Sequence, residues 1–408
     1  MSNNHPKPAI RFAGFTDDWE QRKLGELAIF NPKADLPDVF EYVDLESVVG
    51  TEMLSHRTES KKTAPSRAQR LAQTGDLFYQ TVRPYQKNNY LFEKPDKNYV
   101  FSTGYAQMRP LVDGRFLLCL VQNESFVSVV LDNCTGTSYP AINSNDLAQI
   151  EVYLPSETQE QKQIGDYFKD IDNLITLHQR KYELLLHTKK AMLNKMFPRP
   201  GKRVPEIRFS GYTSPWAQCK LGEMVQFSKG SGYSKSDIKS SGTPIILYGR
   251  LYTKYETEIT NVDTFADERP GSVFSHGGEV IVPASGETAE DISIASVVKQ
   301  SGVLLGGDLN IITPPHDIDS AFLAISISNG KPHADMAKMA QGKSVVHLHN
   351  VDLEKIELVY PRYEEQVQIS TFFRRLDHAI SLHKTRLSVL GNLKNAMLQK
   401  MFPAVGRV

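Results

Sequence analysis

The stretch Pro8–Phe30, PAIRFAGFTDDWEQRKLGELAIF, returns as Pro205–Phe227, PEIRFSGYTSPWAQCKLGEMVQF, with 13 of the 23 positions identical. Two further pairs follow in the same order. Glu160–Gln179 resembles Glu365–Lys384, and AMLNKMFP at Ala191 resembles AMLQKMFP at Ala396. The period of about 200 residues is far longer than the ~20–50 residues of a solenoid repeat. The sequence therefore predicts two copies of one large unit, and two like units suggest a target with two like halves.

The composition limits the class of protein. The 408 residues include 47 basic and 47 acidic side chains and an apolar fraction of 40%, which is typical of a globular chain with two or more cores. The cysteines Cys119, Cys134 and Cys219 show no metal-like spacing, so we expect a reduced, cytoplasmic protein. The start lacks an apolar signal core, and no run approaches ~18 apolar residues, so we expect neither secretion nor a membrane partner.

The charges are unevenly spread, although they balance overall. Residues 178–204 contain eight Lys or Arg against one acid, and residues 53–109 contain ten basic and four acidic residues. Residues 251–300 are acidic, with nine acids against three bases. Local basic patches are typical of phosphate binding, but ordinary solvated faces would give the same counts.

Two long segments place apolar residues alternately four and three positions apart, which predicts two coiled-coil helices of ~35–40 residues. Pro198 and Pro200 end the first helix, and Pro403 ends the second. We expect the two matched seams to pack on each other, although the core face of a bundle helix would show the same stripe. The matched seam positions are Ile164, Phe168, Ile171, Ile175 and His178 in the first segment and Ile369, Phe373, Leu376, Ile380 and His383 in the second.

Polar residues interrupt both seams at equivalent positions. His178 and His383 would meet near the crossing of two antiparallel helices, where a polar pair can set the register. A half-exposed histidine at a loose crossing is the simpler interpretation. Lys189 and Lys394 are expected to point out of the seam.

The segments before each helix are predicted to be mixed α/β. Their shared beginnings and ends enclose dissimilar middles, which is typical of separately specified recognition surfaces, although drift after duplication would look similar. The GKRV that follows the first helix resembles the VGRV that follows the second, so the two ends of the chain are expected to be neighbours. The expected strand-like runs include Val127–Leu131, Ile245–Tyr248, Val280–Val282 and Ile292–Val298.

These repeats and their closing motifs together resemble the specificity subunit of type I restriction–modification systems. The resemblance covers nearly the whole chain. It rests on the paired openings, on the prolines that precede the EQ-x-x-I helices, and on the KMFP ends. The closing frames are YPAIN at Tyr139–Asn143 with Asp146-Leu147, and Asp352-Leu353, followed by Pro155 and Pro361.

The resemblance implies an α+β fold with a pseudo-twofold internal repeat, in which two long antiparallel coiled-coil helices separate two mixed α/β target-recognition domains. The expected ranges are 1–156 and 201–362 for the domains, and 157–200 and 363–408 for the helices. Each domain would read one half of a bipartite, asymmetric site in double-stranded DNA, and the helices would set the spacer and dock modification subunits.

The resemblance also implies the partners and the cofactors. Two modification subunits would carry S-adenosylmethionine and methylate adenine, and restriction subunits would translocate and cut DNA with ATP and Mg²⁺. This chain is expected to bind no cofactor and to be non-catalytic.

The candidate DNA-binding residues lie on loops that carry amides, hydroxyls, aromatic rings and cations. Arg bidentate to guanine and Asn to adenine are standard base-edge pairings, while Lys more often holds phosphate. Surface turns around a β core would have the same composition. In the first domain the candidates are Arg83, Tyr85, Lys87, Asn88, Ser102, Thr103, Tyr105, Thr137 and Tyr139.

The second domain offers a different set. Ser285 begins the acidic motif SGETAED, which resembles a motif of some recognition domains in the family, and a structural role in capping a turn is at least as plausible for it. The other candidates are Lys229, Ser231, Tyr233, Arg250, Lys343 and Ser344.

Enzymatic and metal-binding motifs are missing from the sequence. There is no methyltransferase NPPY-like motif, no GxGxxG and no nuclease-like set of carboxylates. The pair His347 and His349 lacks companion ligands, so we expect no metal site. The remaining alternatives are a stand-alone enzyme acting on DNA or saccharide, and a coiled-coil scaffold whose domains bind proteins.

Overall fold

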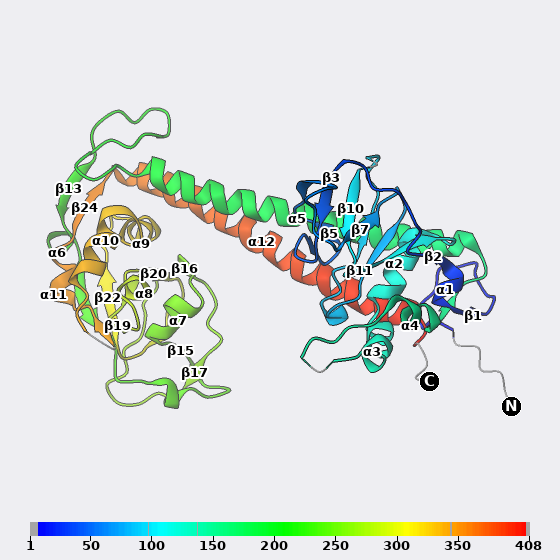
Figure 1. Ribbon diagram of the computed structural model, residues 1–408. Helices are drawn as coiled ribbons and strands as arrows, with labels where there is room; N and C mark the ends of the chain where they lie inside the picture. The colour runs from blue at the N-terminus through cyan, green and yellow to red at the C-terminus, as the bar shows by residue number, and fades with distance from the viewer. Residues whose placement is uncertain (1–6, 97, 137, 343–344, 405–408) are drawn as a thin grey trace. The chain divides into compact units, whose positions relative to one another are not determined.

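The computed structural model describes residues 7–96, 98–136, 138–342 and 345–404 (Figure 1). They form two compact units: the first joins the chain up to Arg180 with the chain from Lys384 onward, and the second is Lys181–His383. The division passes through both long helices, so each unit contains one α/β domain, the beginning of one helix and the end of the other. The four ranges expected from the sequence stay a prediction.

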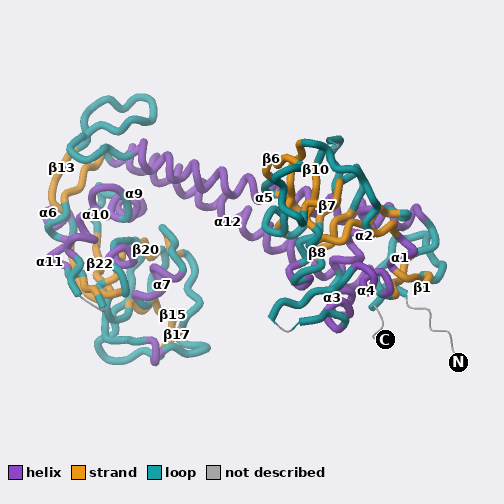
Figure 2. The backbone as a smooth tube through the Cα atoms, viewed as in Figure 1, coloured by secondary structure: helices purple, strands orange, loops and turns teal. Residues whose placement is uncertain are grey.

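The first unit is layered, and Figure 2 shows its strands grouped beside helices. Its two larger sheets have the orders β2-β11-β8-β9 and β6-β3-β10-β7. The strands are β1 Glu20–Lys23, β2 Ala28–Phe30, β3 Val39–Val43, β4 Val48–Val49, β5 Glu52–Met53, β6 Arg57–Ser60, β7 Ala68–Leu71, β8 Leu77–Gln80, β9 Tyr90–Leu91, β10 Tyr99–Ser102, β11 Tyr105–Pro110 and β12 Glu151–Leu154. The helices are α1 Leu24–Leu27, α2 Gly114–Gln122, α3 Glu124–Asp132, α4 Ser144–Gln149 and α5 Thr158–Met196, with a 3₁₀ turn, η1, at Pro84–Gln86.

Strand β8 is buried on both faces, which explains why its sequence is mostly apolar. Leu77 and Tyr79 belong to the core shared with α2 and α3, because alternate residues of a strand point to one face. Phe78 points the other way and stacks on Phe101 of β10, with ring centroids 3.6 Å apart. The sheet that contains β8 therefore lies between the helices and the second sheet.

The second unit repeats this plan with other strands. Val280 and Val282 of β18 share a core with α9, and Ile281 packs in a separate core on the other face. The sheets have the orders β14-β22-β18-β20-β16 and β17-β15-β21. The strands are β13 Ala217–Lys220, β14 Gln226–Lys229, β15 Thr243–Ile246, β16 Glu258–Ile259, β17 Phe265–Ala266, β18 Val280–Pro283, β19 Ser285–Gly286, β20 Ser296–Val298, β21 Leu304–Leu305, β22 Leu309–Thr313, β23 Val346–His347 and β24 Glu357–Tyr360. The helices are α6 Leu221–Met224, α7 Tyr248–Thr253, α8 Ala289–Ile292, α9 Ser320–Ile327, α10 Gly330–Met339, α11 Asn350–Leu353 and α12 Tyr363–Met401, with a 3₁₀ turn, η2, at Lys235–Asp237.

Three expected strands need correction. Residues Val127–Leu131 lie in helix α3, because the side chain of Asn123 caps the helix by accepting from the Ser125 amide. A short apolar run alone does not distinguish a strand from a buried helix. The capping residue Asn123 is the feature of the sequence that indicates a helix here. Of the run Ile292–Val298, the strand β20 covers the last three residues, and Ile292 ends helix α8. Of the run Ile245–Tyr248, the strand β15 covers the first two residues, and Tyr248 begins helix α7.

The predicted helices are confirmed, and each has 39 residues. In the first unit Ile164, Phe168 and Ile171 of α5 share a core with Leu398 and Met401 of α12. In the second unit the equivalent residues Ile369, Phe373 and Leu376 share a core with Met196 of α5. Ile175 and Ile380 are partly buried against the same two cores, and His178 and His383 are half-buried. The beginning of each helix thus packs on the end of the other, as antiparallel seams require.

The two seam lysines form ion pairs instead of pointing outward. Lys394 lies 2.5 Å from Asp172 in the first unit, and Lys189 lies 2.5 Å from Asp377 in the second. Equivalent positions of the repeat supply the two lysines and the two aspartates. Both pairs therefore join α5 to α12 in one register.

The KMFP end of each helix docks on the tryptophan of the repeated opening. Phe402 packs edge-on against Trp19 in the first unit, with centroids 5.9 Å apart, and Phe197 makes the same contact with Trp216 at 5.9 Å in the second. The Ile10 amide also donates to the Lys400 carbonyl in the first unit. The described start and end of the chain are therefore neighbours within the first unit, as the sequence predicts.

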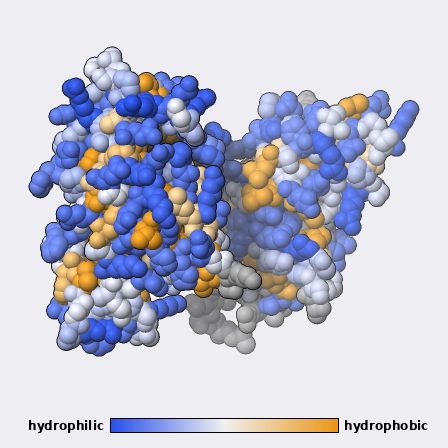
Figure 3. Space-filling model, turned by 90° about the vertical axis from the view of Figure 1, so that its left-hand side faces the viewer, coloured by the Kyte–Doolittle hydropathy of each residue, from blue (hydrophilic) through white to orange (hydrophobic). Residues whose placement is uncertain are grey.

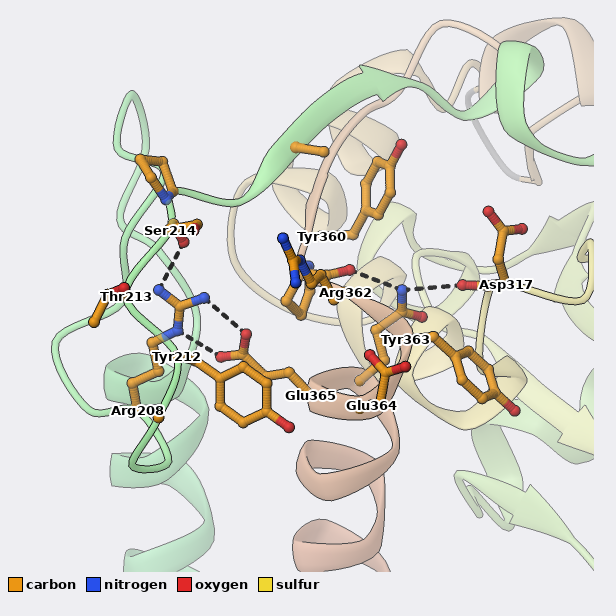
Figure 4. Close-up of a pocket in the computed structure, with 15 residues that line it drawn as sticks. Arg208, Tyr212, Thr213, Ser214, Asp317, Tyr360, Arg362, Tyr363, Glu364 and Glu365 are labelled. Carbon is orange, nitrogen blue, oxygen red and sulfur yellow. Dashed lines mark hydrogen bonds and ion pairs between the residues drawn. The ribbon is translucent and has the colours of Figure 1, made fainter.

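A buried ion pair fastens each opening to the first turn of a long helix. Arg11 donates to both carboxylate oxygens of Glu160, at 2.6 and 2.7 Å, and Arg208 to those of Glu365, at 2.7 and 2.8 Å (Figure 4). The side chains of Glu160 and Glu365 are at most 1% exposed. Removing one partner of such a pair leaves a buried charge uncompensated, which explains why both residues recur in both repeats.

Candidate nucleic-acid interface

The same backbone frame supports the candidate loops in both units. The Thr81 amide donates to the Gly104 carbonyl at 3.0 Å, and the equivalent Ala284 amide donates to the Asp308 carbonyl at 2.8 Å. Both residues also accept at 3.0 Å, Thr81 from the Ile142 amide and Ala284 from the Leu348 amide. Two residues further on, Arg83 in the first unit corresponds to Gly286 in the second.

Closing loops complete the frame in the same way. Thr135 bridges to Ala141 in the first unit, and Gln341 bridges to His347 in the second. The frame therefore makes Tyr139 equivalent to Val345. A shared set of backbone hydrogen bonds thus leads to an arginine and a tyrosine in one unit, and to a glycine and a valine in the other. The backbone itself differs at the first position, because Arg83 is left-handed whereas Gly286 lies in strand β19.

Arg83 is the best-placed candidate for reading a base. Its backbone is left-handed, with φ at +55°, and its amide donates to the Pro140 carbonyl at 2.8 Å. Its guanidinium lies 4.5 Å from the centre of the Tyr139 ring, which is itself 64% exposed. No hydrogen bond or ion pair joins the Arg83 side chain to another described residue. Stacking on the Tyr139 ring orients the Arg83 guanidinium and leaves its N–H groups free to donate to a ligand.

The neighbouring loop residues are held by the protein. Lys87 pairs with Glu124, and Asn88 accepts from the Gly50 amide at 2.8 Å. Tyr85 is 50% exposed, whereas Thr103 is half-buried and its amide donates to the Arg67 carbonyl. Lys87 is thus partly neutralised, and the exposed ring of Tyr85 remains available for contact.

Two candidates of the first unit lie in the protein interior, which argues against direct contact with DNA. Ser102 is buried and accepts from the Gly104 amide, and Tyr105 is fully buried in an aromatic core. Burial raises the pKa of Tyr105 well above its usual range. Both residues shape the turn between β10 and β11. Thr137 lies outside the described residues.

Sequence reasoning did not single out a set of exposed cations in the first unit. Lys61, Lys62 and Arg67 lie on the loop between β6 and β7, and all three are exposed. Within the part of the chain that the structure describes, no ion pair joins them to an acidic residue. The Arg67 carbonyl accepts from the Thr103 amide, which connects this loop to the frame. The basic excess of residues 53–109 was the signal that pointed here.

In the second unit, hydrogen bonds within the protein hold several of the candidate DNA-binding residues. Arg250 donates to Glu256 at 2.8 and 2.9 Å and to the Asn261 carbonyl, with only 8% of its side chain exposed. Tyr233 and Ser285 are buried, and their hydroxyls bond the Asp267 carbonyl and the Asp308 carboxylate. Arg250, Tyr233 and Ser285 are therefore bonded within the protein, which argues against direct contact with DNA.

Other loops remain at the surface of the second unit. Lys229 is exposed, and half-buried Ser231 accepts from the Val273 amide. A Cβ at Gly230 would lie 1.9 Å from the Gly306 carbonyl oxygen, so two loop backbones touch at this glycine. Lys343 and Ser344 lie outside the described residues. In Figure 3 hydrophilic residues cover most of the near face of this unit.

The acidic motif SGETAED of the second unit caps a turn, which is one of the two roles that the sequence suggests for it. The Thr288 hydroxyl accepts from the Asp291 amide and caps helix α8. Burial raises the pKa of the Tyr252 hydroxyl, and the neighbouring Tyr248, Glu287 and Asp291 raise it further. The exposed Glu287 follows directly on Gly286, the position that corresponds to Arg83. The two units therefore present opposite charges next to equivalent points of one frame.

The described residues contain no group of three or more His, Cys, Asp or Glu arranged to hold a metal ion. His347 and His349 lie with parallel rings whose centroids are 6.2 Å apart. None of the described helices is by itself long and apolar enough to cross a membrane, and the bent pair α2 and α3 passes that test by length and composition.

Comparison with known proteins decides the family. The model of the type I restriction modification DNA specificity domain matches residues 16–187 and again residues 213–392, which together are more than half of the chain. The chain belongs to this family. It is a sequence-specific DNA-recognition subunit of the type I restriction–modification class, with a recognition role rather than a catalytic one.

Named relatives agree with this assignment. The chain is 22% identical over 314 residues to the type I restriction enzyme MjaVIII specificity subunit of Methanocaldococcus jannaschii, covering 74% of the chain and 72% of that protein. It is 24% identical over 282 residues to the putative MjaX specificity subunit of the same organism, covering 66% and 62%.

Solved structures show the same fold. The S subunit of a type I restriction–modification system from M. genitalium superposes with a TM-score of 0.64 at 14% identity, over 97% of this chain and 99% of that one. A chain from a study of complex assembly and conformational transition of the type I R-M system gives 0.52 at 20% identity, over 96% and 98%. The predicted fold class, two mixed α/β domains with long helices in an internal repeat, is confirmed.

Proposed function

We propose that each unit reads one half of a bipartite, asymmetric DNA site. The observation that carries this proposal is the shared frame with unlike side chains: Arg83 and Tyr139 in the first unit, and Gly286 and Val345 in the second. A protein that met two identical half-sites would need no such difference. Arg83 would read a guanine edge, while Lys61, Lys62 and Arg67 would hold phosphates.

The long helices would set the spacing between the half-sites. A helix is a stiff element that rises 1.5 Å per residue, so its length and register convert to a number of base pairs. The ion pairs Asp172–Lys394 and Lys189–Asp377 support one register, because both join the same two helices at equivalent positions. His178 and His383 remain candidates for a further register contact.

Catalysis would be supplied by partner subunits. We propose that two modification subunits bind the chain, carry S-adenosylmethionine and methylate adenine, and that restriction subunits use ATP and Mg²⁺. The long helices offer apolar positions for such partners, because Leu177 and Leu184 of α5, and Leu382 and Val389 of α12, are 40–65% exposed and seven residues apart. The free cysteines support a cytoplasmic location.

Binding of the isolated chain to duplex DNA should weaken steeply with salt. Because phosphate contacts release counterions, we expect the affinity to fall at least about 100-fold between about 50 and 200 mM salt. Replacing Lys61, Lys62 and Arg67 by glutamine should reduce the slope of log K against log salt by about three. Fluorescence anisotropy over a salt series measures both quantities.

The matched control replaces three exposed helix lysines, Lys162, Lys181 and Lys190, by glutamine. It removes the same charge and should leave the slope near that of the wild type. A flat salt dependence in the wild type would favour a protein-binding scaffold over a DNA reader. An equal loss of slope in both triple variants would remove the β6–β7 loop from the interface.

A further inference from the structure

Each unit contains a two-stranded antiparallel ribbon made from the repeated opening and the strand that precedes a long helix. In the first unit β1 pairs with β12, and Lys23 lies opposite Glu151. In the second unit β13 pairs with β24, and Lys220 lies opposite Glu357. The two ribbons have the same register and the same direction.

The ribbons have two distinct faces, because alternate residues of a strand point to opposite sides. One face turns to the core: Val152 of β12 is fully buried, and Leu358 of β24 is 2% exposed. We call the other face the outer ribbon face. Its exposed members are Gln21, Lys23 and Glu151 in the first unit and Gln218, Lys220 and Glu357 in the second, and the partly buried Tyr153 and Val359 complete it.

The three exposed residues of the outer ribbon face are identical in the two units, whereas the residues on the other side of the ribbon are not. Gln, Lys and Glu occupy equivalent positions in both ribbons. Opposite the buried Val152 and Leu358, the residues are Arg22 in one ribbon and Cys219 in the other. All four residues of β1 are exposed, and so are three of the four residues of β13, so burial does not explain why one side of the strand is retained and the other is not.

Contacts within the chain do not explain the identity. In the first unit Gln21 donates to Glu151 at 2.5 Å, and Lys23 donates to Gln149 at 2.8 Å. In the second unit Glu357 pairs with Lys331, at 3.6 Å. The same side chains thus have different internal partners, and exposed pairs contribute only about 0–1 kcal/mol to stability.

We propose that the outer ribbon face is a docking surface for the modification subunit, with one copy on each unit. One protein surface that binds twice requires the same side chains in both places, and this face supplies them as a Lys beside a Glu. The partner would present an acidic group opposite the lysine and a basic group opposite the glutamate. The identity of the partner as the modification subunit rests on the proposed function.

The test measures how many modification subunits bind the full-length chain. Wild-type chain and the variants Lys23→Glu, Lys220→Glu and the double variant are titrated with modification subunit, and native mass spectrometry gives the stoichiometry and affinity. Each single variant should keep one tight site and weaken the other at least about 10-fold. The double variant should weaken both sites.

The matched control is Arg22→Glu, which makes the same change of charge on the variable side of the same ribbon, where Arg22 is exposed. It should retain two tight sites. The exchange Lys23→Glu with Glu151→Lys keeps opposite charges across the ribbon. It should still weaken one site, whereas full recovery would show that the pair acts only within the chain.

Two results are separable. If the double variant bound two modification subunits with wild-type affinity, the docking surface would be refuted and the proposed function would stand. If the wild-type chain bound DNA but no modification subunit, the proposed function itself would fail, and the docking surface with it.

Discussion

Replacing Arg83 by alanine is expected to weaken specific DNA binding by about 10–100-fold and to relax the preference at one base pair of one half-site. The reason is geometric. The Tyr139 ring orients the guanidinium, and the side chain has no bond to another described residue that would compete with a guanine edge. Binding to a library of half-site variants, measured for the wild type and the variant, gives both the affinity and the preference.

Three further variants sharpen this result. Arg83→Lys keeps the charge and loses the bidentate fork, so it should retain general affinity and lose most of the preference. Tyr139→Phe keeps the ring that stacks on Arg83, and it should behave like the wild type. Arg67→Ala should weaken binding to all sequences alike, because it removes a phosphate contact. If Arg83→Ala discriminated bases as well as the wild type, Arg83 would not read the sequence.

Replacing Phe402 by alanine is expected to lower the free energy of unfolding of the first unit by about 3–5 kcal/mol. Phe402 is 5% exposed and packs on Trp19 and Phe116, with centroids 5.9 and 5.5 Å away. The change leaves a cavity where the end of α12 docks on the repeated opening. The second unit has its own equivalent contact, so its unfolding should not change.

The two tryptophans allow each unit to be followed separately. Trp19 reports on the first unit in a Trp216→Phe background, and Trp216 reports on the second unit in a Trp19→Phe background. Urea unfolding followed by tryptophan fluorescence then measures Phe402→Ala in both backgrounds. The matched variant Phe197→Ala should affect the second unit, to a smaller extent because Phe197 is less buried. An effect of Phe402→Ala at Trp216 alone would contradict the assignment of contacts.

The sequence predicted the framework well because the repeated residues contact one another. Trp19, Phe402, Arg11 and Glu160 all recur, and each makes the same contact in its unit as its counterpart does in the other. Helix length and ends followed from the heptad spacing and from the prolines. Internal repetition supplied the evidence that a single sequence usually lacks, because two copies reveal which positions were retained.

The recognition residues were predicted less well, because burial depends on distant strands. The predicted recognition loops stay a prediction. Tyr105 and Tyr233 are polar-tipped residues that the structure buries against segments far along the chain. The spacing of Arg250 in the sequence does not predict its hydrogen bonds to Glu256 and to the Asn261 carbonyl. The exposed cations of the β6–β7 loop belong to no motif, so spacing alone did not distinguish them from solvated charges.

The most direct test of the account is to map methylated adenines in cells that produce this chain together with its modification subunit. Single-molecule sequencing of genomic DNA reads the methylated motif. We predict a split motif, with two unlike short parts at a fixed separation, and we predict that Arg83→Ala alters only one part. A continuous motif, or a motif with two identical halves, would contradict the reading of unlike half-sites by the two units.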